Sequence, residues 1–321
     1  MIAAMISPAP RPPARVDARG RRVGPKPGTT TSRVDGARSG RAARAEIHRL
    51  APWRRRLAPL RAVDSDDATS PAPSRSYVVP GRPVNPGLYC DWSVTDADVA
   101  EVWAYRVSLS VVALSVLACS SQAFIATDPV GAGGGSDPSW LDAAYFTGAA
   151  GLGVALRLIH MYVDPIKKFM QSLYAVGLAG SVGVAALASQ NDGGSVPAYV
   201  VTHPAAVWAV GPMFAALTGV AFKEGMCYGK AECALLFFVI PATLLSHLTG
   251  LANEGVEKGL LGAWCVFIAV FAARKYTQEV KDDIGDKSVF IFNDLGEDEK
   301  TEWVSRARAR DPARFARMSG E

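Results

Sequence analysis

Six apolar runs follow one another in the middle of this 321-residue chain, and no other feature constrains its fold as strongly. Each run is close to the roughly 20 residues that a helix needs to cross a bilayer. One such run could be a buried helix of a soluble protein, but six in succession are typical of a membrane bundle. The sequence therefore predicts an all-α fold, a polytopic helical membrane bundle of about six transmembrane helices. The predicted spans are Tyr105–Ala126, Trp140–Tyr162, Phe169–Ser189, Tyr199–Phe222, Ala231–Leu251 and Leu260–Ala273.

Basic residues alternate from one turn of this predicted bundle to the next. The turns after the first and third spans contain no lysine or arginine, and Lys258 after the fifth stands beside Glu254 and Glu257. Loops rich in lysine and arginine stay on the cytoplasmic side of a membrane, which for a plastid is the stroma. Both termini are therefore predicted to be stromal. The basic residues of the other three turns are Lys167, Lys168, Lys223, Lys230, Arg274, Lys275 and Lys281.

The N-terminal segment differs in composition from the rest of the chain. Residues 1–63 hold fourteen arginines and one lysine but three acidic residues, with no apolar periodicity. Such a segment is typical of an organelle transit peptide, although a disordered basic arm that binds nucleic acid is an alternative. We predict a plastid transit peptide or disordered extension over residues 1–75. From Ser76 onward 18 basic and 24 acidic residues remain, which is unlike a nucleic-acid-binding surface.

Three further parts follow this extension. Residues 76–103 are predicted to form a stromal segment with a short helix, for which Thr95 and Asp98 provide a capping-box pattern. Residues 104–274 form the six-helix transmembrane domain, and residues 275–321 form a stromal tail. Within the tail, the apolar SVFIF stretch of KDDIGDKSVFIFND is expected to dock on the stromal end of the bundle.

Small residues recur at four-residue spacing in the third and fourth spans, which lets helix backbones approach closely in lipid. Two prolines, Pro212 and Pro241, lie within the fourth and fifth spans and are expected to kink them, because each removes a backbone donor. Kinks of this kind can serve gating, but proline is also common in membrane helices. The small residues are Gly177, Ala179, Ser181, Gly183, Gly211, Ala215 and Gly219.

The direction of each span gives its polar residues a depth. His160, Glu224, Cys227 and Glu232 share the stromal level, whereas His203 and His247 share the opposite level. Carboxylate, thiolate and imidazole would suit iron or zinc, so the first four residues are a candidate metal site. The alternatives for this turn are interfacial anchoring with ion pairs to Lys223 and Lys230, or binding of a polar substrate or partner.

The two histidines of the opposite level have simpler explanations beside their functional ones. His203 precedes Pro204 and fits the start of a helix. His247 lies deeper, where a structural hydrogen bond and a proton-handling role are both open. His247 and Glu232 are fifteen residues apart, about 22 Å along a helix, so they cannot bind the same ion.

Four stretches resemble a known family: WSVTDADVAEVWAYR, GPMFAALTGVAFKEGMCYGKAE, LLSHLTG and DIGDKSVF. They resemble the uncharacterised integral membrane proteins shared by cyanobacteria and plastids, domain of unknown function 2301, over roughly Tyr89–Phe290. The resemblance implies a multi-pass protein of a photosynthetic membrane. It implies no catalytic residue, because no activity is established for the family.

The sequence shows no nucleophile–base pair, phosphate-binding loop or dense ligand set, which favours a protein that is not an enzyme. We expect a scaffold or assembly partner for other membrane proteins, or a transporter, in the lipid bilayer of a thylakoid or inner envelope. The alternative is a membrane-embedded metal-binding or redox protein that uses the stromal-level His/Glu/Cys cluster. No cofactor is identified. A transporter would be favoured by a water-filled pocket that is flanked by Pro212 and Pro241 and reaches His247, and the absence of a visible inverted repeat counts against it.

Overall fold

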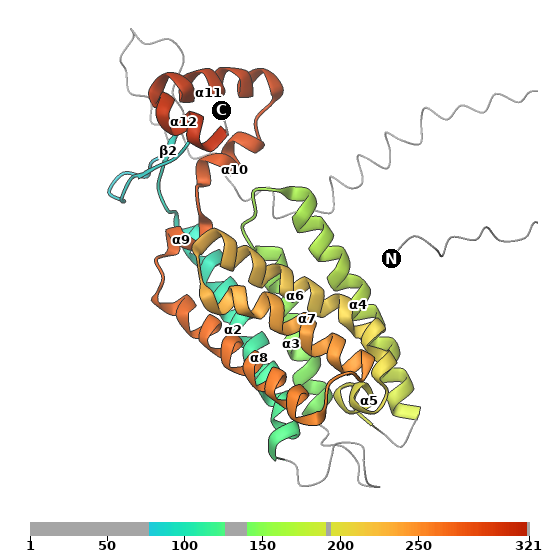
Figure 1. Ribbon diagram of the computed structural model, residues 1–321. Coiled ribbons are helices and arrows are strands. Elements are labelled where there is room, and N and C mark those ends of the chain that lie inside the picture. Colours follow the sequence, from blue (N-terminus) through green and yellow to red (C-terminus); the bar gives the residue numbers. More distant parts are fainter. Residues whose placement is uncertain (1–76, 126–139, 191–193, 320–321) are drawn as a thin grey trace, which may run out of the picture. The chain divides into compact units, whose positions relative to one another are not determined.

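The computed structural model describes residues 77–125, 140–190 and 194–319, and the predicted transit peptide therefore lies outside the described residues. Long helices run alongside one another in a bundle (Figure 1). This confirms the predicted all-α membrane bundle. The long helices are α2 (Asp96–Ile125), α3 (Trp140–Leu158), α4 (Asp164–Gln190), α6 (Val207–Tyr228), α7 (Ala231–Thr249) and α8 (Glu254–Arg274).

Helix α2 is longer than the first predicted span, because the predicted short helix and the span form one element of 30 residues. Its start is fixed by the predicted capping box. The Asp98 amide donates to Thr95 Oγ1 at 3.2 Å, and the Thr95 amide donates to Asp98 Oδ2 at 2.8 Å. The helix contains no glycine or proline, so no helix-breaking residue separates the predicted short helix from the predicted span. The predicted boundary between the N-terminal segment (76–103) and the transmembrane domain (104–274) thus falls inside α2.

The fourth predicted span is divided where the sequence carries a proline. Its residues belong to three elements: α5 (Val196–Thr202), a 3₁₀ turn (Pro204–Ala206) and α6. Pro204 lacks the amide that would continue α5, and the residue before a proline is pushed out of helical geometry. His203 accordingly has φ −129° and ψ 80° and joins the two pieces. Its place at this junction agrees with the helix-boundary explanation.

Five of the described helices are long and apolar enough to cross a membrane, namely α2, the 3₁₀ turn with α6, and α4, α7 and α8. Helix α3, the second predicted span, has 19 residues and is not among them. At 1.5 Å per residue it is still about 28 Å long, close to the thickness of a hydrocarbon core. Its sequence is rich in glycine and alanine because much of it faces other helices: Gly148, Ala149, Gly151, Leu152 and Ala155 are all buried.

Helices α4 and α6 approach closely, as the small residues predicted. A Cβ atom on Gly177 would lie 2.1 Å from the Met213 nitrogen, and one on Gly180 would lie 2.2 Å from the Ala209 carbonyl oxygen. The predicted small residue Gly183, in contrast, has open space beside it. The contact therefore depends on Gly177 and Gly180, one helical turn apart on one face of α4.

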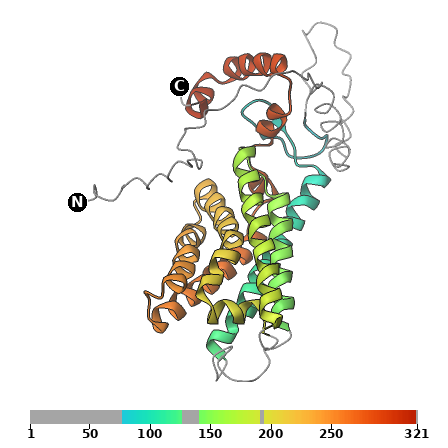
Figure 2. The same cartoon turned by 90° about the vertical axis from the view of Figure 1, so that its right-hand side faces the viewer.

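The tail packs at the end of the bundle where α2 begins and α8 ends. Strands β1 (Asn85–Pro86) and β2 (Asp91–Trp92) form a two-stranded antiparallel sheet. Figure 2 shows α10, α11 and α12 gathered with this sheet beyond one end of the long helices. The helices of the tail are α9 (Val280–Ile284), α10 (Lys287–Asn293), α11 (Glu297–Arg310) and α12 (Pro312–Ser319).

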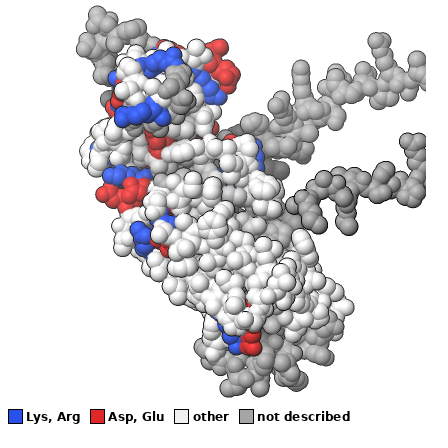
Figure 3. Space-filling model, viewed as in Figure 1, with Lys and Arg blue, Asp and Glu red and all other residues white. Residues whose placement is uncertain are grey.

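Contacts of the SVFIF stretch show that it docks on this end of the bundle. The Phe290 ring of α10 packs edge-on against the His160 ring, and the centroids of the Phe290 and Tyr162 rings are 4.9 Å apart. Just before it, Ile284 is buried with Trp92 and Val102. On the face shown in Figure 3, charged side chains gather over the tail and near the helix ends, and the sides of the helices are mostly uncharged. This is the pattern of a bundle whose sides meet lipid.

Candidate functional site

The charged side chains around the turn that links α6 to α7 are buried at the end of the bundle. Glu224 is 0% exposed, and its carboxylate accepts hydrogen bonds from Lys223 at 3.1 Å, Lys230 at 2.7 Å and Lys275 at 2.7 Å. Tyr105 of α2 donates its hydroxyl to the same carboxylate at 3.2 Å. One glutamate thus joins α2, the α6–α7 turn and the end of α8.

The same arrangement continues through Lys275 into α9. The Lys275 Nζ atom lies 2.5 Å from Asp283 Oδ1, and Arg106 Nε donates to Asp283 Oδ2 at 2.7 Å. Arg106 also donates to the carbonyl oxygens of Gln278 and Glu279 at 3.0 and 3.2 Å. These contacts fix the segment after the last span against the start of α2.

We call these six buried residues the charge cluster: Arg106, Lys223, Glu224, Lys230, Lys275 and Asp283. Four are cations and two are carboxylates, so the cations are in excess. A buried charge is costly unless it is paired. Here aromatic rings, together with the two carboxylates, stabilise the buried cations. Lys275 Nζ lies 5.0 Å from the centroid of the Tyr105 ring. Burial lowers the pKa of Lys230, although Glu224 beside it acts in the opposite direction.

The four residues of the candidate metal site do not form one ligand set in the described structure. Glu224 is surrounded by lysines, and Arg274 Nη1 donates a hydrogen bond to Glu232 Oε2 at 2.6 Å. The Cys227 side chain lies outside the described part of the structure. No group of three or more His, Cys, Asp or Glu side chains could hold a metal ion among the residues described. The ion pairs expected for this turn are present, and metal binding remains a prediction.

His160 lies just beyond α3, on the same side of the bundle as the charge cluster. Its Nε2 is 3.8 Å from Glu101 Oε2, and its ring packs against Phe290. Burial lowers the pKa of His160 to about 4, and the charges of Lys223 and Lys167 act in the same direction. The imidazole is therefore neutral at physiological pH, as expected for a packed polar residue.

The other predicted residues lie in or near the opposite half of the bundle. His203 is exposed, stacks on Tyr199 with ring centroids 4.1 Å apart, and its Nδ1 lies 2.9 Å from Thr202 Oγ1. Pro212 and Pro241 lie inside α6 and α7, each of which is one continuous helix. None of these three contacts the charge cluster.

A cavity of about 710 Å³, partly open to the outside, lies among the helices in the half of the bundle away from the charge cluster. Its wall is built by α2, α3, α5, α6, α7 and α8, and most of the lining side chains are apolar. His247 lines it and donates Nε2–H to the Val200 carbonyl oxygen at 2.9 Å. The His247 Nδ1 atom lies 3.6 Å from Glu257, and Glu254, Glu257 and Lys258 also line the cavity.

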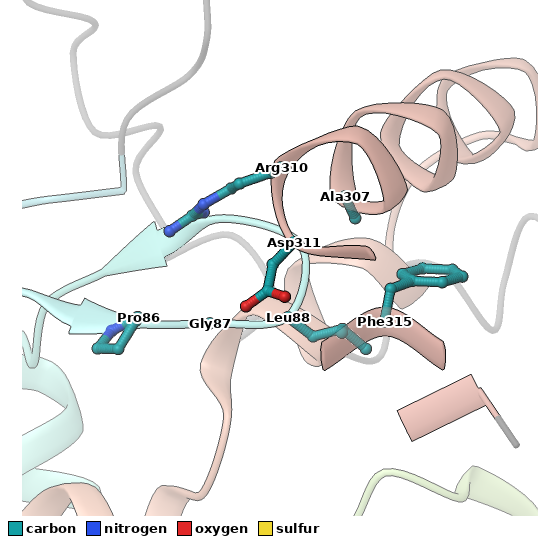
Figure 4. Close-up of a pocket in the computed structure, with 7 residues that line it drawn as sticks. All are labelled: Pro86, Gly87, Leu88, Ala307, Arg310, Asp311 and Phe315. Atoms are coloured by element: carbon teal, nitrogen blue, oxygen red, sulfur yellow. The ribbon is translucent and has the colours of Figure 1, made fainter. Parts of the chain in front are cut away.

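A second, smaller hollow of about 220 Å³ lies in the tail. Figure 4 shows it between the loop that follows β1 and the α11–α12 junction, with Leu88 and Phe315 on its apolar side. Arg310 extends toward the sheet, where it pairs with Asp91. This arginine therefore already has a carboxylate partner.

Several residues of these sites were not predicted from the sequence. Arg106 and Asp283 carried a usable signal, since an arginine at the start of an apolar span and an aspartate beyond the last span are both costly unless paired. Trp264 carried none, because tryptophan is ordinary in a membrane helix. The cavity also had no signal in the sequence, since it results from how six helices pack.

Comparison with known proteins agrees with the membrane architecture. Residues 154–292 match a family described as "Uncharacterized integral membrane protein (DUF2301)", and this covers α4 to α10 with the end of α3. The matched region begins later than the resemblance predicted from Tyr89. No curated protein and no solved structure matches the chain. The chain is therefore an integral membrane protein of several apolar helices, and residues 154–292 match a family of integral membrane proteins.

Proposed function

We propose that this membrane protein is a transporter or carrier that holds a small, largely apolar molecule inside its bundle. The cavity of about 710 Å³ is the observation that supports this proposal. Ligand pockets commonly have volumes of about 300–1,000 Å³ with mostly apolar walls and a few polar groups. The cavity also reaches His247, which is one part of the condition that would favour a transporter on sequence grounds, but Pro212 and Pro241 do not line it and its walls are mostly apolar.

A scaffold or assembly partner is the other function expected from the sequence, and it explains less of the structure. Such a protein binds its partners through outer surfaces, so it requires no interior space. A partly open pocket of this size with mostly apolar walls is more simply explained if an apolar molecule occupies it.

A cavity-filling variant tests the proposal. Ala123 of α2 lines the cavity, whereas Ala104 of the same helix is exposed, so Ala123→Trp and Ala104→Trp form a matched pair. We expect mass spectrometry of the purified protein to find a bound apolar small molecule with wild type and Ala104→Trp, and its loss with Ala123→Trp. An equal content of bound molecules in all three proteins, or none beyond bulk lipid in wild type, would overturn the proposal.

We also propose that the protein acts in a plastid membrane, either thylakoid or inner envelope, with stromal termini. The arginine-rich composition of residues 1–75 supports a plastid address, and the alternation of basic turns supports the orientation. Fractionation of plastids that contain a C-terminally tagged full-length chain tests the location. Recovery of the tag from a non-plastid membrane would contradict it.

A further inference from the structure

The charged side chains on the cavity wall are confined to one place. They are Glu254, Glu257 and Lys258, all in the first five residues of α8. His247 near the end of α7 adjoins them, with its Nδ1 atom 3.6 Å from Glu257 Oε2. We call these four residues the polar edge of the cavity. The other described residues that line the cavity are uncharged.

Uncharged polar side chains are scattered among the apolar ones over the rest of the wall. Thr243 and Tyr145 already share hydrogen bonds with oxygen atoms of the protein, at 2.8 and 2.7 Å. On α2 the hydroxyl groups of Ser115 and Ser120 and the amide of Gln122 are available to neutral groups. Because an ion in such surroundings lacks a charged partner, this part of the wall suits an apolar or weakly polar body.

The cavity extends through about half of the membrane thickness. Its lining residues run from Val207 to Leu217 on α6 and from Glu254 to Trp264 on α8. At 1.5 Å per residue each stretch is about 15 Å long, and a hydrocarbon core is about 30 Å thick. Both helices begin at the end of the bundle away from the charge cluster. The cavity therefore has the depth of one leaflet, with its charged residues at the outer end of α8.

The polar edge can be reached by a molecule in the cavity. The side chains of His247 and Glu257 are 23% and 30% exposed. The Lys258 ammonium is paired with Glu254 at 2.7 Å, whereas the distance of 3.6 Å between His247 and Glu257 is too long for a hydrogen bond. An ionised carboxylate such as that of Glu257 only accepts hydrogen bonds, so it repels an anion and favours a hydroxyl donor.

We infer that the cavity takes a small amphiphile from the bilayer, with an apolar chain along the wall and a neutral head that donates hydroxyl hydrogens to Glu257. This inference rests on the proposed function and specifies its ligand class. The cavity lies among membrane-spanning helices, so a molecule dissolved in the bilayer can enter it from one leaflet. Its head then stays at the outer level, where the polar edge lies.

Three probes with the same dodecyl chain test the inference with the full chain in nanodiscs of zwitterionic lipid. Dodecylglycerol has a neutral head with hydroxyl groups, dodecyl phosphate an anionic head and dodecyltrimethylammonium a cationic head without hydroxyl groups. Retention of each radiolabelled probe is measured above that of empty nanodiscs, at equal probe content of the lipid. We expect wild type to retain dodecylglycerol more tightly than either charged probe. Over dodecyl phosphate the preference should be about 5-fold or more, the ratio that one like-charge contact near 4 Å gives even in water.

The variant Glu257→Gln removes the negative charge and keeps an oxygen that accepts hydrogen bonds. We expect it to retain dodecylglycerol, which also shows that its cavity is intact, and to bind dodecyl phosphate more tightly than wild type does. The control Glu279→Gln makes the same change at an exposed carboxylate near the charge cluster and should keep the wild-type preference. The comparison of probes in wild type requires no variant, so it decides the class of head even if Glu257→Gln does not fold.

Different outcomes separate this inference from the proposed function. Wild type that retains dodecyl phosphate or dodecyltrimethylammonium as well as dodecylglycerol overturns the hydroxyl-bearing head and leaves the cavity as a site for apolar chains. An unchanged preference in Glu257→Gln overturns the assignment of Glu257 as the acceptor. Failure of wild type to retain any probe above empty nanodiscs overturns both proposals.

Discussion

At the scale of single residues, the charge cluster is sensitive to the sign of each charge. Glu224 is the shared partner of three lysines, and all four side chains are buried. Cations exceed carboxylates in the cluster, so removing a carboxylate increases the imbalance while removing a lysine reduces it. The two kinds of substitution should therefore have unequal effects on stability.

We predict that Glu224→Gln lowers the stability of the fold by about 3–5 kcal/mol, because it leaves buried cations uncompensated. Lys223→Met should have a smaller effect. Thermal unfolding of the purified variants in detergent provides the comparison. The control Glu279→Gln changes an exposed carboxylate, which pairs with Lys281 outside the cluster, and should leave the unfolding temperature unchanged. A loss with Lys223→Met equal to that with Glu224→Gln would contradict the argument.

His160 provides a prediction about pH. Its pKa is lowered to about 4 in the folded protein from an ordinary value of 6.5, so between these values the unfolded chain binds a proton that the folded one does not. Stability must then fall as pH decreases through this window, by roughly 2 kcal/mol at pH 5. We predict that wild type loses more thermal stability between pH 7 and pH 5 than His160→Asn does. Identical losses in the two proteins would show that His160 is not held neutral by burial.

At the scale of elements, the contact between α4 and α6 depends on individual glycines rather than on a general motif. In lipid the association of helices relies on close packing, since the surroundings are as apolar as the helices themselves. Gly180 faces the backbone of α6, whereas Gly183 on the same helix faces open space. The four-residue spacing in the sequence predicted Gly183 for helix contact and did not include Gly180.

We predict that Gly180→Ala destabilises the bundle by about 1–3 kcal/mol, because the added Cβ atom meets a backbone oxygen that cannot move aside. Gly183→Ala should be neutral or stabilising, since alanine is the better helix former by roughly 1 kcal/mol. Resistance of the two variants to unfolding in detergent mixtures would show the difference. The prediction is wrong if Gly183→Ala is the more damaging change.

At the scale of the whole molecule, the bundle has two unlike ends. One end holds the charge cluster and the docked tail, and the other half holds the cavity. The Lys230 and Lys275 side chains come from different turns and meet on one glutamate, which places these turns at the same end. Two of the basic turns predicted to share one side of the membrane thus lie at the same end of the bundle.

We predict that Lys168 and Lys281 are modified from the same face of a sealed membrane vesicle by an impermeant amine reagent, and that Lys258 is modified from the opposite face. All three lysines are exposed. Peptide mapping after labelling of intact and opened vesicles identifies the reactive face of each residue. Lys168 and Lys281 labelled from opposite faces would disprove the orientation argued from the basic turns.

The sequence by itself determined the membrane bundle, the approximate spans and the level at which Glu224 and Glu232 lie. These follow from one-dimensional properties, the length of apolar runs and the helical rise, which do not depend on neighbouring helices. The capping box at Thr95 could be predicted for the same reason, because its hydrogen bonds join residues three apart.

Only the tertiary structure decided which polar groups meet. Arg106 and Asp283 are 177 residues apart, and no local pattern specifies that they pair. Ion pairs of Glu224 with the nearby Lys223 and Lys230 were open to prediction, but its contact with Lys275 was not, because the end of α8, distant in sequence, brings Lys275 to it. The cavity likewise arises from the side-by-side packing of helices distant in sequence, which is set by the fit of their surfaces.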